Sequence, residues 1–151
     1  MFALITLHML SAVIWVGGMF FAYVCLRPIA AKELEPAQRL TLWQGVFSKF
    51  FPWVWATIAL LIISGHGMIA MMGGFAHIGT HVHVMLGTGY VMIAIFGHLF
   101  FSPYKKLSRA VAAENWLDAG IQLNIIRKMV GINLLIGLAT VAVAAGGRYL
   151  L

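Results

Sequence analysis

The sequence predicts an all-α fold, namely an integral membrane four-helix bundle with antiparallel, up-down topology. Only 9% of the 151 residues are charged and 62% are hydrophobic, whereas a soluble domain has about 25% charged residues. Four apolar runs are long enough to cross a bilayer as helices, which takes about 20 residues each. No alternation with a period of two runs through them, so strands are excluded. A soluble enzyme, a disordered chain and, because Cys25 is the single cysteine, a disulfide scaffold are excluded as well.

The first and third apolar runs end at a proline, which breaks helices, the second ends at a pair of glycines, and the fourth ends at a charged arginine. The first run has no basic residue before it and exceeds the apolar stretch of a signal peptide, so we expect a retained helix. We expect one transmembrane domain over residues 1–151. Its helices are predicted at about residues 2–26, 50–72, 80–101 and 129–147. The residues at which the apolar runs end are Pro28, Gly73, Gly74, Pro103 and Arg148.

Basic residues predict the orientation in the membrane. Seven Lys and Arg fall in the first and third loops and none in the second, so the positive-inside rule places the two longer basic loops in the cytoplasm. Both termini and the short second loop then face the periplasm, as expected for a multi-pass protein of a bacterial inner membrane. The net charge of +6 indicates contact with the anionic lipid bilayer rather than with nucleic acid. The seven residues are Arg27, Lys32, Arg39, Lys49, Lys105, Lys106 and Arg109.

The two basic loops have some local structure of their own. Pro36 after Glu35 suits the first turn of a short helix. The third loop, residues 104–122, mixes basic and apolar residues, which is typical of an interfacial amphipathic segment or of a short solvated connector.

Six histidines are the most informative feature of so apolar a chain, because ionisable residues inside a membrane are costly and are often functional. Counting about 1.5 Å per helical residue, we expect His8, His66 and His83 in one layer near the outer end of the bundle. His77 and His81 lie above that layer, in or beside the outer loop. His98 is about 22 Å from His83 along the same helix and belongs to the inner half.

One chemistry that uses such a layer is b-type haem held between two imidazoles. We expect His8 and His83 as the axial ligands of the haem iron, with His66 as the reserve ligand. Small residues on adjacent turns leave room for a porphyrin. They are Ser11, Ala12, Gly65, Gly67 and Gly87. The corresponding function is electron transfer or a membrane oxidoreductase step with a redox partner or a quinone.

The alternative chemistry is copper handling, because methionines share the outer layer and thioether with imidazole suits copper. An outer copper site would consist of His77, His81, Met68 and Met72. The spacing of His77, His81 and His83 is also typical of a metal triplet, although Gly79 lies between the first two. The structural alternatives are core methionines, solvated loop histidines and a helix hydrogen bond at His98.

Several stretches of the chain resemble small standalone CopD-like membrane proteins, named after the membrane component of copper-resistance systems. The similarity covers nearly the whole chain, and the wider superfamily includes HemJ-type protoporphyrinogen oxidases, which are four-helix haem proteins. The stretches are LHMLSAVIWVGGMFFAYVCLRP (residues 7–28), FFPWVWA (50–56), SGHGMI (64–69), HVHVM (81–85), GHLFFSPYKKL (97–107) and IRKMVGINLLIGL (126–138).

The resemblance extends to individual positions. His8 matches the family's helix-one histidine, and His98 matches a family position too. His83 stands where HemJ-type proteins have a lysine, so the resemblance implies a second imidazole ligand here and speaks against HemJ-type oxidase activity, the third alternative. His66 stands where relatives often have another residue.

Other catalytic chemistries find no support in the sequence. The chain has no paired carboxylates, no Ser/His/Asp set and no phosphate-binding loop, and its four acidic residues all lie in loops. A carboxylate proton relay inside the membrane is therefore excluded. We expect Asn133 to make an interhelical hydrogen bond and Gly131 and Gly137 to allow close helix packing. The sequence leaves open whether the chain forms a homo-oligomer.

Overall fold

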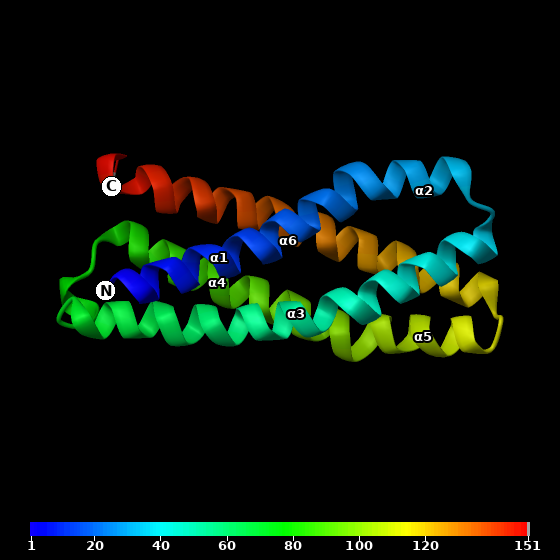
Figure 1. Ribbon diagram of the computed structural model, residues 1–151, viewed down its shortest axis with the longest axis horizontal. Helices are drawn as coiled ribbons and strands as arrows, with labels where there is room; N and C mark the ends of the chain where they lie inside the picture. Colours follow the sequence, from blue (N-terminus) through cyan, green and yellow to red (C-terminus); the bar gives the residue numbers. More distant parts are fainter. Residues whose placement is uncertain (151) are drawn as a thin grey trace.

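The computed structural model describes residues 1–150, and this part of the chain is entirely helical and turn, without strands (Figure 1). These residues form six α-helices, two π-helical segments (η1 and η3) and one short 3₁₀ helix (η2). In chain order the elements are α1 (Phe2–Phe20), η1 (Phe21–Leu26), α2 (Arg27–Glu33), α3 (Pro36–Met71), η2 (Phe75–His77), α4 (Thr80–Leu99), η3 (Phe100–Tyr104), α5 (Lys105–Ala112) and α6 (Trp116–Leu150).

These elements join into four long rods, each apolar and long enough to cross a membrane: residues 2–33, 36–71, 80–112 and 116–147. The predicted four-helix membrane bundle is thereby confirmed. Figure 1 shows the rods side by side, with the chain start, the α3–α4 turn and the last turns of α6 at one end. We call this the terminal end. The opposite end, with the α2–α3 and α5–α6 turns, is called the basic end.

The predicted helix limits at the basic end were wrong. Helices continue through Pro28 and Pro103, and α3 and α6 begin at Pro36 and Trp116 rather than near residues 50 and 129. A π-helical turn precedes Pro28 and contains Pro103. Such a turn shifts the hydrogen-bond register, so the rod absorbs the missing proline N–H without ending. The two longer basic loops are therefore mostly helix, and only short turns at residues 34–35 and 113–115 remain.

The helix that we expected to be short at Pro36 begins there but is the start of the second span. Its N-terminus has a reciprocal cap between Glu35 and Gln38. The predicted third loop, residues 104–122, forms α5 and the first turns of α6. Helix α5 buries Leu107 and Ala110 and leaves Lys105 exposed. This agrees with the amphipathic character predicted for it.

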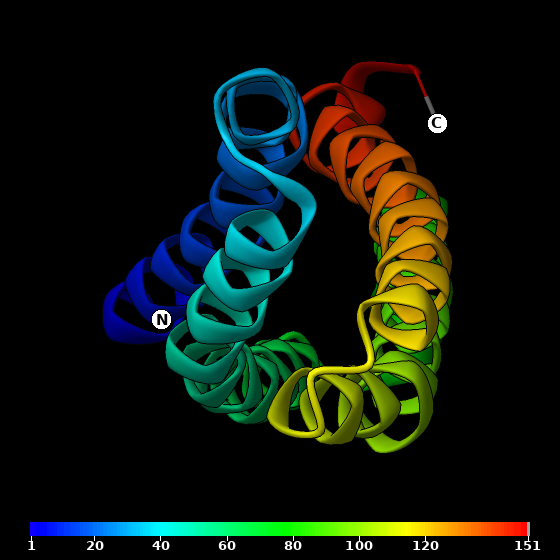
Figure 2. The same ribbon diagram turned by 90° about the vertical axis from the view of Figure 1, so that its right-hand side faces the viewer.

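The rods associate mainly as two pairs, α1 along α3 and α4 along α6, and α6 also contacts α1 and α3. In Figure 2 the two pairs lie on opposite sides of the molecule. Glycines permit the close approach that was expected of them. A Cβ at Gly137 would lie 3.0 Å from Met92 and 3.1 Å from Val16, and one at Gly131 would lie 3.0 Å from the ring of Tyr23.

Aromatic rings fill the basic half of the core. Phe51 stacks on Phe47 with ring centroids 5.0 Å apart and meets Tyr104 edge-on at 4.8 Å. The predicted interhelical bond of Asn133 is present, since its Nδ2 donates to the carbonyl of Met92 at 3.4 Å. The histidines other than His98 lie outside this aromatic part of the core, at the terminal end.

Candidate functional site

His8 on α1 has a fixed ring orientation because it contacts Ser64 on α3. Its Nδ1 lies 2.9 Å from the Ser64 Oγ, and that hydroxyl lies 2.5 Å from the Leu60 carbonyl. A hydroxyl has one proton, which Ser64 donates to Leu60, so we assign Nδ1–H of His8 as the donor to Ser64. Nε2 of His8 then carries a lone pair. A ring anchored in this way is typical of histidines that bind metals.

His77 and His83 are anchored in the same manner, through backbone carbonyls. Nδ1 of His77 lies 3.0 Å from the Gly73 oxygen, and Nδ1 of His83 lies 3.3 Å from the Gly79 oxygen. A carbonyl only accepts, so each Nδ1 is protonated and each Nε2 has a free lone pair. Both side chains are exposed. Three of the five histidines at the terminal end therefore combine an anchored Nδ1 with an Nε2 that is available as a ligand atom.

His66 differs because both of its ring nitrogens are engaged. Its Nδ1 lies 2.9 Å from the Ile62 carbonyl, and its Nε2 lies 3.1 Å from the Tyr90 hydroxyl across the α3–α4 interface. Nδ1 must donate to the carbonyl, so Tyr90 donates to Nε2. Binding a metal would require His66 to give up Tyr90. The geometry favours a helix-joining role for this residue.

The remaining residues of the predicted outer copper site also lie at the terminal end. His81, half-buried on α4, packs against α6, where a Cβ at Gly147 would be only 2.7 Å from its own Cβ. Met68 is half-buried near the end of α3, and Met72 follows that helix with 46% of its surface exposed. Along the chain these residues flank the α3–α4 turn that also holds His77.

The histidine layer is not one compact cluster. No group of three or more His, Cys, Asp or Glu residues in the described part of the chain is close enough to hold one metal ion. The predicted triplet of His77, His81 and His83 is therefore not assembled. A copper site at this end would combine fewer histidines with methionine sulfur.

The residues at the terminal end fit a haem poorly. Of the glycines expected to leave room for a porphyrin, Gly65 and Gly67 are covered, because a Cβ there would lie 3.3 Å from the His8 ring and 3.2 Å from Leu4, whereas Gly87 faces open space. The two helices that carry His8 and His83 each pack mainly on other helices, α1 on α3 and α4 on α6. A pocket at the basic end and a small cavity among Trp15, Phe51 and Phe96 both lack histidines in their lining.

His98 lies far from this end. It is exposed near the end of α4, at the other end of that helix from His83. It is a suitable reference residue for experiments on the terminal end.

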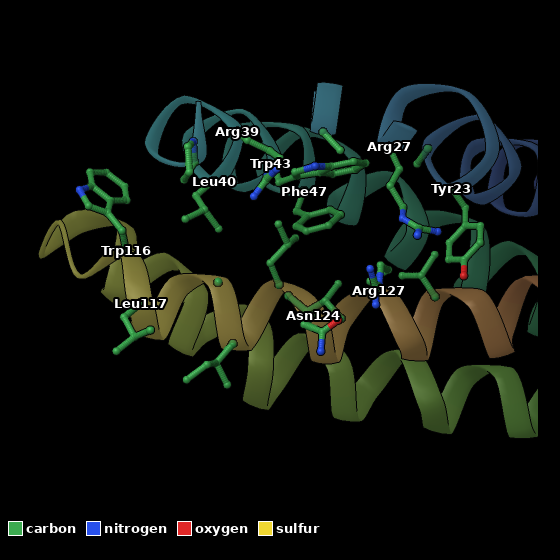
Figure 3. Close-up of a pocket in the computed structure, with 18 residues that line it drawn as sticks. Tyr23, Arg27, Arg39, Leu40, Trp43, Phe47, Trp116, Leu117, Asn124 and Arg127 are labelled. Atoms are coloured by element: carbon green, nitrogen blue, oxygen red, sulfur yellow. The ribbon is translucent and has the colours of Figure 1, made fainter. Parts of the chain in front are cut away.

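The pocket at the basic end lies where the sequence predicted only charges that orient the chain. It measures about 580 Å³ and lies between α2–α3 on one side and α6 on the other (Figure 3). Arg27, Arg39 and Arg127 line it together with Trp43. One signal in the sequence could have indicated it, since the lining cations are all arginines although lysines lie close by.

Fold and site together define a multi-pass, four-helix membrane protein with histidines and methionines gathered at one end of the bundle. The family described as Copper resistance protein D (CopD) matches residues 44–146, more than half of the chain, so the protein belongs to this family. The resemblance predicted from the sequence is confirmed. No curated protein and no solved structure matches the chain. The match includes His66, His77, His81, His83 and His98 but begins after His8.

Proposed function

We propose that this protein handles copper at the membrane, as a transport or resistance component that binds the ion at the terminal end. The family match supports copper as the cargo. The observation that carries the proposal is the common geometry of His8, His77 and His83. Each has Nδ1 hydrogen-bonded to an oxygen atom and Nε2 available for a ligand bond.

Methionines complete the proposed site. Thioether sulfur and neutral imidazole are ligands that Cu(I) prefers. Met68 and Met72 border the α3–α4 turn next to His77, and His81 and His83 open α4 directly after it. We propose this turn, with its flanking helix ends, as the point where copper enters or leaves the bundle, and His8 on α1 as a further ligand deeper in the same end.

The haem hypothesis has less support. A haem between His8 and His83 would need these side chains to meet across helices that pack mainly on other partners, and Leu4 covers Gly67, although Gly87 faces open space. The family match favours copper. We therefore keep haem only as the competing outcome of the experiments below.

The charge distribution supports an orientation for this site. Seven basic residues border the basic end between Arg27 and Arg109, and none lies in the segment from Gly73 to Gly79. The positive-inside rule then places the terminal end, with its histidines, on the periplasmic side of a bacterial inner membrane. Copper would be bound or released on that side.

Metal binding by histidine variants tests the proposal. Protein purified in mild detergent is titrated with Cu(I) against a coloured Cu(I) chelator. His83→Ala and His77→Ala should each lower the affinity by about tenfold or more, because a ligand atom is lost. His98→Ala is the matched control, a histidine of the same helix outside the site, and should bind as the unmodified protein does. Equal effects of His98→Ala and His83→Ala would contradict the assignment.

A further inference from the structure

The pocket at the basic end is lined by arginine and aromatic side chains instead of histidine and methionine, so it suits a different ligand from the terminal end. Figure 3 shows arginine, tryptophan and tyrosine side chains from α2, α3 and η1 facing α6 across the pocket. Its volume of about 580 Å³ lies in the range of small-molecule sites, roughly 300 to 1,000 Å³. The lining comes from three rods, so the pocket is part of the bundle and not a local loop feature.

The polar side chains of the pocket, from both of its sides, are mostly positively charged. Arg27, Arg39 and Arg127 line it, and no Asp or Glu is among the 18 lining residues. Among the described side chains the one ion pair joins Lys32 to Glu33, so these arginines have no acidic partner there. Arg27 lies 4.8 Å from the ring centroid of Tyr23, which holds its position. Planar guanidinium groups with free donors are the side chains best suited to phosphate oxygens.

The rest of the wall is apolar and opens to the outside of the bundle. Trp43 and Phe47 are buried on α3, whereas Leu117 and Ile121 on α6 are 80% and 53% exposed. All four line the same pocket. A ligand whose charged group meets the arginines would therefore have an apolar part that can leave the pocket over Leu117 and Ile121 into the lipid.

Two of the three arginines, Arg27 and Arg127, lie near the depth of lipid headgroups. Along their helices, at about 1.5 Å per residue, Arg27 is about 37 Å from Phe2 and Arg127 is about 30 Å from Gly147. The hydrocarbon core of a bilayer is about 30 Å thick. If the terminal end lies at one membrane surface, the pocket reaches the headgroup layer of the other.

We propose that this pocket binds one anionic phospholipid, with its phosphate held by Arg27, Arg39 and Arg127 and its acyl chains passing over Leu117 and Ile121. Basic pockets between transmembrane helices on the cytoplasmic side are known to bind anionic headgroups. The lipid would join α2 and α3 to α6, the two sides of the bundle that the pocket separates. Its role is independent of copper, which we place at the other end.

Lipid retention tests the proposal. Delipidated protein is reloaded with phosphatidylglycerol or with phosphatidylcholine of the same acyl chains, and bound lipid is counted by native mass spectrometry. We expect one phosphatidylglycerol per chain, retained about tenfold better than phosphatidylcholine. Equal retention of the two lipids would overturn the proposal. Displacement by millimolar inorganic phosphate alone would also overturn it, because the pocket would then be a site for free anions.

Two kinds of variant locate the lipid. The triple variant Arg27→Gln/Arg39→Gln/Arg127→Gln should lose phosphatidylglycerol by about tenfold or more. The control Lys32→Gln/Arg109→Gln/Lys128→Gln removes the same charge from the same end outside the pocket and should retain it. If the triple variant fails to fold, Gly120→Trp decides the question, since Gly120 lines the pocket and faces open space. Unchanged retention in Gly120→Trp, or equal losses in the triple variant and its control, would overturn the assignment.

Discussion

The Nδ1 of His8 on α1 lies 2.9 Å from the hydroxyl oxygen of Ser64 on α3, a residue with 1% of its surface exposed. The two residues are 56 positions apart in the chain, so this bond exists only when α1 and α3 are packed. It fixes the ring of His8 and leaves Nε2 as the available ligand atom. The bond therefore couples helix packing to the proposed copper site.

Ser64→Ala should weaken both properties. Loss of the hydrogen bond should lower the free energy of unfolding by about 0.5–1.5 kcal/mol and the copper affinity by about tenfold, as expected when an anchoring partner of a metal ligand is removed. Ser48→Ala is the control, because Ser48 on the same helix bonds only its own backbone, at the Gly45 oxygen. Thermal unfolding in detergent and Cu(I) titration measure the two effects. A copper affinity unchanged in Ser64→Ala would show that His8 is not a ligand.

His66 should prove structural. We expect His66→Ala to change the copper affinity by less than about threefold while lowering stability by about 1 kcal/mol. Tyr90→Phe should lower the free energy of unfolding by a similar amount. The loss in the double variant His66→Ala/Tyr90→Phe should be smaller than the sum of the two single losses, because both changes remove the same hydrogen bond. A double-mutant cycle on unfolding free energies measures this. A loss of copper in His66→Ala as large as in His83→Ala would make His66 a ligand.

Gly147 should be essential to the position of His81. A Cβ at Gly147 would lie 2.7 Å from the Cβ of His81, which no rotation of the histidine can relieve, whereas a Cβ at Gly146 would meet nothing within 4 Å. Gly147→Ala should therefore separate α4 from α6 and lower the free energy of unfolding by about 1–3 kcal/mol. Gly146→Ala should be neutral or slightly stabilising. Equal melting temperatures of the two variants would contradict this packing.

The orientation can be tested at the turns that the structure defines. Reporter fusions within residues 34–35 and 113–115 should give a cytoplasmic signal, because the basic residues border these two turns. A fusion at Gly74 should give a periplasmic signal. The opposite pattern would place the histidines in the cytoplasm and reverse the proposed direction of copper handling.

Hydropathy sufficed to predict the number and helical nature of the spans, since these depend on composition over 20 residues. The helix ends near Pro28 and Pro103 were not predictable in this way. A π-helical turn accompanies each of these two prolines. The register of such a turn depends on how the whole rods pack. Proline was therefore read as a stop signal where the structure uses it inside a rod.

The candidate site was predictable in its residue types and its end of the bundle, but not in its hydrogen bonds. Ser64 contacts His8, and Tyr90 contacts His66, from another helix in each case. No local sequence pattern therefore predicts these contacts. The arginine pocket was missed for a related reason. Arg27 and Arg39 were interpreted singly as charges that orient the chain, and only the fold brings them together with Arg127 at one pocket.

The central claim is that copper, and not haem, is bound at the terminal end. Its most direct test is the metal content and absorbance spectrum of protein purified from cells supplied with both copper and a haem precursor. We predict about one copper ion per chain, lost in the double variant His77→Ala/His83→Ala, and no Soret band. A Soret band with about one haem per chain, abolished by His8→Ala or His83→Ala and accompanied by no copper, would contradict the account.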